Sequence, residues 1–126
     1  MASVDTKFLA IKDIFSLLSN DPIIQSYVGR KIFPIVARQS VSGDFIAIQR
    51  DGYRVSYTKM GMAMQRSIFF ITVVSEDYDR SLEIAERVFQ VLHGDHTNPD
   101  LRIRLEDYGE DFLDKKYVQV LKFNIE

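Results

Sequence analysis

The chain has 126 residues and a mass of 14.6 kDa, which is the size of one domain, and we take residues 1–126 as a single unit. It is 46% hydrophobic and 27% charged, and its formal net charge of −2 lacks the basic excess that is typical of nucleic-acid-binding domains. The absence of cysteine excludes disulfides, thiolate catalysis and cysteine-based zinc sites. No apolar run approaches the roughly 18 residues of a membrane span, and no signal-peptide core is visible, so we expect an intracellular protein without a membrane partner.

Two helices are predicted at the start of the chain. In the segment 5–19, apolar residues recur at spacings of three and four, which predicts an amphipathic helix with Asp5 as its N-cap. The tripeptide Asn20-Asp21-Pro22 ends that helix and begins a second, because aspartate caps helices and proline fits the first helical position. Gly29 marks the end of the second, short helix.

The next part of the chain is predicted to hold an extended piece, a loop and a hairpin. Residues 30–34 are expected to be extended, and residues 37–44 are polar and typical of a loop. Side-chain alternation predicts strands over 45–50 and 53–58, and the turn signal Asp51-Gly52 joins them as a hairpin.

A central strand and the main helix follow. Residues 67–74 are apolar on both faces, which places this strand in the middle of a sheet. The main helix is predicted to begin at Asp77 or Asp79 and to end at His93-Gly94. Residues 95–99 are expected to form a loop.

Two more strands are predicted in the last quarter of the chain. Alternation over 101–106 indicates a half-buried strand, residues 107–114 are acidic and turn-like, and 117–125 is the last strand. The order α-α-β-β-β-α-β-β predicts an α+β fold, in which an N-terminal helix pair and one long helix pack on a mostly antiparallel sheet of about five strands.

The only two histidines lie close together, and this suggests a metal site. His93, Asp95 and His96 carry side chains of the kind that bind zinc and similar ions. A catalytic site needs a third protein ligand and a structural site a fourth, and the nearest further carboxylate is Asp100. A helix end followed by a surface loop explains the segment more simply, so we expect no metal here.

No other segment indicates catalysis or a cofactor. The acidic residues over 106–114 lack the spacing of an EF-hand loop, and a solvated loop explains them better. The chain has no Gly-x-Ser-x-Gly elbow, no Walker A loop and no dinucleotide-binding glycine motif. We therefore expect a non-enzymatic protein without a cofactor.

Three of the four methionines are concentrated in one short segment. Met60, Met62 and Met64 alternate with smaller residues, which is a strand pattern with all three on one face. Methionine is also flexible and polarizable, so the same residues suit an adaptable binding surface. Both interpretations hold together if a neighbouring subunit covers that face.

Charge is unevenly distributed along the chain. Residues 30–66 hold seven basic and two acidic residues, whereas residues 76–114 hold four basic and twelve acidic ones. Two solvated faces whose charges cancel within the fold would explain this distribution. Head-to-tail association of a basic patch with an acidic patch on the next copy would explain it too, and such heterologous interfaces generate rings. A DNA-binding patch is a third interpretation, which the acidic half of the chain weakens.

An ordered set of segments adds a resemblance to these patterns. The matching segments, in chain order, are Asn20-Asp21-Pro22 after the first helix, Tyr27-Val28-Gly29-Arg30, Lys31-Ile32-Phe33-Pro34, Phe45-Ile46-Ala47-Ile48, the strand 68–74, and the helix 79–92 with its Ile84-Ala85-Glu86-Arg87-Val88 core. Over most of its length the chain resembles the tail-completion, or tail terminator, proteins of long-tailed bacteriophages and prophages. Gly43-Asp44 departs from the proline that this family commonly has before the aromatic residue of the second strand.

The resemblance implies a structural protein of the virion, assembled in the bacterial cytoplasm. Members of this family form a ring, usually a hexamer, on the end of the finished tail tube. The ring stops tube growth and presents a surface to the connector of the head. The implied partners are therefore further copies of the chain, the tail tube protein and the head connector protein, and the family supplies no catalytic residues to match.

These considerations give one interface hypothesis and three alternatives. Arg50, Arg54 and Arg66 are expected to contact acidic residues of the adjacent copy, namely Glu106, Asp107 and Asp111. Met60, Met62 and Met64 are expected to pack on tube subunits or on the neighbouring copy. The alternatives are a head–tail joining protein of the neck, a small metal- or ligand-binding domain using the 93–96 region, and a nucleic-acid binder using the basic segment 30–66.

Overall fold

The computed structural model describes residues 10–34, 43–58, 61–97 and 100–125, and among these it describes the backbone but not the side chains of 51–58, 61–66 and Asp100. Within these ranges the chain forms three helices and six strands. In chain order they are α1 (Ala10–Ser19), α2 (Pro22–Val28), β1 (Ile32–Pro34), β2 (Phe45–Thr58), β3 (Gly61–Ser75), α3 (Tyr78–Leu92), β4 (Gly94–Thr97), β5 (Asp100–Leu113) and β6 (Lys116–Ile125).

The six strands form one mixed sheet in the order β1-β2-β3-β6-β5-β4. β1 runs parallel to β2, and every other neighbouring pair is antiparallel. The predicted α+β class and the mostly antiparallel sheet are confirmed, and β3 lies in the centre as its two apolar faces indicated. The strand count is six instead of about five, because β1 and β4 join the sheet while the strands predicted over 45–50 and 53–58 are one strand, β2.

The two N-terminal helices follow the predicted signals. Ile14 and Leu18 of α1 are fully buried, and residues 5–9 of the predicted helix lie outside the described residues. Asp21 caps α2, because its carboxylate accepts a hydrogen bond of 3.0 Å from the backbone N–H of Ile24. Gly29 ends α2 with a φ of 61°, a conformation that favours glycine.

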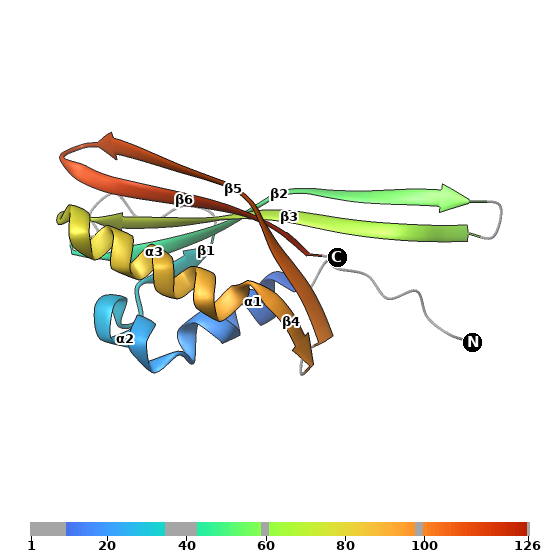
Figure 1. The fold of residues 1–126 in the computed structure, drawn as a ribbon, viewed down its shortest axis with the longest axis horizontal. Helices are drawn as coiled ribbons and strands as arrows, with labels where there is room; N and C mark the ends of the chain where they lie inside the picture. Colours follow the sequence, from blue (N-terminus) through green and yellow to red (C-terminus); the bar gives the residue numbers. More distant parts are fainter. Residues whose placement is uncertain (1–9, 35–42, 59–60, 98–99, 126) are drawn as a thin grey trace.

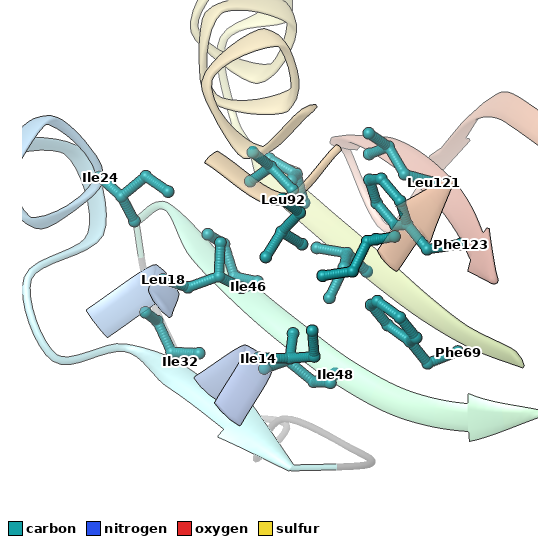
Figure 2. Close-up of a cluster of buried hydrophobic side chains, with 14 of the residues drawn as sticks. Ile14, Leu18, Ile24, Ile32, Ile46, Ile48, Phe69, Leu92, Leu121 and Phe123 are labelled. Atoms are coloured by element: carbon teal, nitrogen blue, oxygen red, sulfur yellow. The ribbon is translucent and has the colours of Figure 1, made fainter. Parts of the chain in front are cut away.

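The hydrophobic core lies between the helices and one face of the sheet (Figure 1). Side chains from α1, α2, β2, β3, α3 and β6 meet there, as Figure 2 shows for Leu18, Ile24, Ile46 and Leu92. Phe69 and Phe123 are fully buried and stack with their ring centroids 5.4 Å apart. Burial of such a side chain stabilises the fold by about 1.5–3 kcal/mol.

The predicted hairpin turn at Asp51-Gly52 is wrong. In the register between β2 and β3, Arg50 pairs with Phe69 and Gly52 pairs with Ile68, so Asp51 is the extra residue of a β-bulge. β2 therefore continues to Thr58, and β3 begins at Gly61. Glycine inside a strand commonly marks a bulge, and the dipeptide is ambiguous until the partner strand is known.

Two further expected loops are strands in the structure. Residues 107–113 belong to β5, which pairs with β6, and only Asp114 and Lys115 form the turn, with φ values of 52° and 64°. Positive φ at both central residues is the geometry of the tightest β-hairpins. Residues 94–97 form β4, which pairs with β5, because Gly94 with a φ of 127° lets the chain turn directly from helix to strand.

β2 and β3 extend beyond the rest of the sheet as a two-stranded arm, which we define as residues 51–66 (Figure 1). The last register pair between β3 and β6 joins Ser67 to Ile125, so within the described chain the arm pairs only with itself. Of the segment 59–64, residues 61–64 form part of β3, and Met60 lies outside the described residues. Met62 and Met64 thus lie in a strand, as predicted. The prediction that they share one face is wrong, because their register partners Tyr57 and Ser56 are consecutive residues of β2, so Ala63 is the extra residue of a β-bulge and the two positions fall on opposite faces.

Candidate functional site

The residues of the suggested metal site are engaged in local contacts. His93 Nδ1 accepts a hydrogen bond of 3.1 Å from the backbone N–H of Leu105, and its ring stacks on Phe89. His96 Nε2 lies 2.7 Å from the carbonyl oxygen of Leu92. Asp95 forms an ion pair of 2.7 Å with Arg104, and the guanidinium lowers the pKa of that carboxyl.

Strand geometry separates these potential ligands. Asp95 and His96 are consecutive residues of β4, so their side chains leave opposite faces of the sheet. The described part of the chain contains no group of three or more side chains that could hold a metal ion. The structure therefore offers no support for metal chemistry at residues 93–96.

The basic and methionine residues of the interface hypothesis lie on the arm and at its base. Arg50 is half-buried at the base, where it pairs in register with Phe69. Further out, Arg54 and Arg66 are register partners. Met62 pairs with Tyr57 and Met64 pairs with Ser56.

The acidic residues of the hypothesis lie on β5. Glu106 is the extra residue of the bulge between Leu105 and Asp107. Asp107 pairs with Lys122 and Asp111 pairs with Val118. Lys122 and Val118 alternate along β6 with the buried residues Leu121 and Gln119, which face the helices. Asp107 and Asp111 therefore lie on the face of the sheet opposite the helices.

The sheet separates the arm from the acidic end of β5. In the β3–β6 register, Ser67 at the base of the arm pairs with Ile125, and Ser75 pairs with Tyr117 beside the β5–β6 turn. Eight residues of extended chain span about 27 Å. The arm thus lies at one end of the sheet and the β5–β6 turn at the other (Figure 1). The register places Arg54 and Arg66 on the arm and Asp111 near that turn.

One surface was missed by the sequence analysis. Tyr78 at the start of α3 and Tyr108 and Phe112 on β5 are 41%, 42% and 54% exposed. The ring centroid of Tyr117 lies 5.3 Å from that of Tyr78 and 4.8 Å from that of Phe112. We call these four residues the aromatic surface. Alternation of Tyr108, Glu110 and Phe112 was the available signal, and the acidic residues between them obscured it.

A buried polar network supports the aromatic surface. Gln119 is fully buried, and its side-chain nitrogen donates to Ser81 Oγ and to the carboxylate of Glu110, both at 3.1 Å. The hydroxyl of Tyr108 donates to the side-chain oxygen of Gln119. Hydrogen bonds from Gln119 and Tyr78 lower the pKa of Glu110, and the bond to Glu110 raises the pKa of Tyr78.

Two hollows in the described surface lie away from the 93–96 region. One of about 610 Å³ lies between α1, α2 and β1 and is lined by Phe15, Gln25, Arg30 and neighbouring residues. A second of about 420 Å³ adjoins it and is lined mainly by apolar side chains, among them Ile11, Ile32 and Ile48. Neither hollow brings together a pair of acidic and basic groups that would perform acid–base chemistry.

Comparison with known proteins gives a likeness of fold. No family model and no curated protein matches the sequence. Among solved structures, a chain from the virion of a native gene transfer agent (GTA) particle superposes with a TM-score of 0.75 at 15% sequence identity, over 89% of each chain. At this identity the likeness establishes the fold. Of the helices described, none has the length and apolarity that crossing a bilayer requires.

Proposed function

We propose that this protein is a structural component of a phage-like virion and that it terminates the tail. Copies of the chain form a ring on the end of the tail tube, stop its growth and prepare the junction with the head. The observation that carries the proposal is the shared fold with a chain of a gene transfer agent virion over 89% of each chain. The segments that resemble tail terminator proteins, including Asn20-Asp21-Pro22 and the helix 79–92, support the same role.

The arrangement of charge supports head-to-tail assembly. Arg54 and Arg66 are register partners on the arm, and like charges directly opposite each other destabilise a strand pair. An acidic surface on the next copy would relieve this repulsion. Asp107 and Asp111 lie on β5 of the same sheet, away from the arm, so repeating one contact from copy to copy builds a heterologous interface.

The remaining interface residues extend this proposal. Phe69, the register partner of Arg50, pairs with Phe123, and Phe123 pairs with Leu105. Arg50 and the bulge residue Glu106, which follows Leu105, thus lie at nearly the same level of the sheet, between the arm and the acidic end. Met62 and Met64, together with Met60 from the sequence, supply the arm with adaptable apolar side chains that suit a tube subunit or a neighbouring copy. Such a protein acts by shape and charge and needs no catalytic group or cofactor.

The test is capping of tail tubes. The full chain is added during polymerisation of the tail tube protein from the same genome, and the tubes are viewed by electron microscopy. We expect shorter tubes with a ring at one end, and light scattering of the isolated rings should give about 88 kDa if six copies of 14.6 kDa assemble. Tubes of unchanged length without end density would contradict the proposal, and binding to the head connector alone would indicate the joining role.

A further inference from the structure

Exposed apolar side chains are concentrated at one end of the molecule. Six large hydrophobic residues of the described chain are exposed, and four of them lie at the start of α3 or near the tip of the β5–β6 hairpin. These four are Tyr78, Tyr108, Phe112 and Leu113. Clustered exposed aromatic residues are typical of protein–protein interfaces.

The aromatic surface is held in place before any partner binds. Tyr108 donates a hydrogen bond to the buried Gln119, and the ring of Tyr117 contacts the rings of both Tyr78 and Phe112. Rigid aromatic side chains lose little conformational entropy on binding, which favours their use as anchors. These contacts thus indicate a binding surface whose side chains are already ordered in the single chain.

The chemistry around this surface selects a basic and apolar partner. The segments 76–79 and 106–114 contain three and five acidic residues. The basic residues that directly follow them are fewer: Arg80, which pairs with Asp44, Lys115, and Lys116, which lies over the ring of Phe45, so the surroundings of the surface are acidic in balance. Arginine and lysine bind over aromatic faces, and methionine sulfur makes favourable contacts with aromatic rings.

The arm has the matching composition. Between residues 51 and 66 it contains two arginines, one lysine, three methionines and two tyrosines against a single acidic residue, Asp51. Its base and the aromatic surface lie about 27 Å apart along the sheet, and the arm projects away from that surface, so it does not reach the aromatic surface of its own chain. The complementary partner that the sequence itself supplies is the arm of another copy.

We propose that the aromatic surface is the docking site for the arm of a second copy of this chain. The inference rests on the proposed ring and names the contact that closes it. The basic residues of the arm lie against the acidic surroundings of that surface, and its methionines and tyrosines pack on Tyr78, Tyr108 and Phe112. Each copy uses its arm once and its aromatic surface once, so the contact propagates in one direction.

Photo-crosslinking of the full chain tests this contact. Benzoylphenylalanine is placed at position 112 in unlabelled protein, which is mixed with ¹⁵N-labelled wild type, irradiated and analysed by mass spectrometry. We expect crosslinks from position 112 to ¹⁵N-labelled peptides within residues 51–66. The matched control places the same group at Phe15, which is 41% exposed on α1 and should give no crosslink to the arm.

A pair of variants provides an independent measurement. Phe112→Ser should weaken self-association at least tenfold by sedimentation velocity, whereas Ile23→Ser, at a similarly exposed position on α2, should leave it unchanged. Circular dichroism checks that both variants keep the fold.

Two results would overturn the inference even if tubes are capped. One is crosslinks from position 112 to any region other than the arm, and the other is a chain that stays monomeric and gives no arm crosslinks. Arm crosslinks without tube capping would sustain this contact and overturn tail termination.

Discussion

Asp21 joins two helices through one carboxylate. It caps α2, and it also accepts two hydrogen bonds from the guanidinium of Arg87, one of 3.0 Å from Nε and one of 2.6 Å from a terminal nitrogen. The Asp21 side chain is only 9% exposed, so its loss removes a cap and takes the carboxylate partner away from the partly buried Arg87. We expect Asp21→Ala to lower the free energy of unfolding by about 2 kcal/mol in urea titrations at pH 7. Glu86→Ala, which removes an exposed carboxylate of α3, should change it by less than about 0.5 kcal/mol.

The pH dependence of stability gives this residue a second signature. Arg87 is the main cause of the lowered pKa of Asp21, which burial opposes. A group with a lowered folded pKa stabilises the fold fully above its unfolded pKa, and this contribution disappears as the pH falls through the folded value. The stability difference between wild type and Asp21→Asn should therefore shrink as the pH falls from about 5 toward 2. A difference that stays constant over that range would show that the charge of Asp21 contributes nothing.

Sequence patterns predicted the role of Asp21 only in part. The cap was visible, because aspartate before proline and an apolar run is a local signal. The bond to Arg87 spans 66 residues and depends on how α3 packs against α2, which no local pattern encodes. The same limit applies to His93 and Asp95, whose partners Leu105 and Arg104 lie on the neighbouring strand.

At the scale of elements, helices were predicted more closely than strands. The boundaries of α2 and α3 agree with their capping residues Asp21 and Asp77. The long strands β2 and β5 were each divided by the sequence analysis, because Asp51-Gly52 and the acidic run after Glu106 are typical of turns. Whether such a residue forms a bulge or a turn depends on the partner strand, and that information is not local.

Two residues at the ends of elements, Lys115 and Gly29, have a positive φ, and substitutions at these positions should change stability in opposite directions. Lys115 has a φ of 64° in the β5–β6 turn, where glycine is favoured, so we expect Lys115→Gly to stabilise the protein by about 0.5–1 kcal/mol. Gly29 has a φ of 61°, and a Cβ added there would meet no atom within 4 Å, so Gly29→Ala should destabilise by about 1 kcal/mol or more through backbone strain alone. Thermal unfolding followed by circular dichroism measures both changes, and shifts of the same sign would refute this explanation.

At the scale of the whole molecule, the sheet holds two unlike ends apart. The uneven charge of the sequence predicted a basic part and an acidic part, but not where they would lie. The register of β2, β3, β6 and β5 places the basic arm at one end and Asp111 toward the other. The aromatic surface could not be predicted, because Tyr78 and Phe112 are brought together only when α3 packs beside the β5–β6 hairpin.

Charge reversal at the two ends tests whether these parts meet between copies. Arg54→Glu and Asp111→Arg should each weaken self-association about tenfold or more in sedimentation velocity at low salt, because each places like charges in contact. The double variant should recover much of the loss, since the reversed charges then attract again. Raising the salt concentration should weaken self-association of the wild type and reduce the differences between variants, because exposed charges are screened.

Arg30→Glu makes the same charge change at an exposed position outside the arm and should leave association intact. An equal loss in that control, or association that does not respond to salt, would show that the charged ends do not pair.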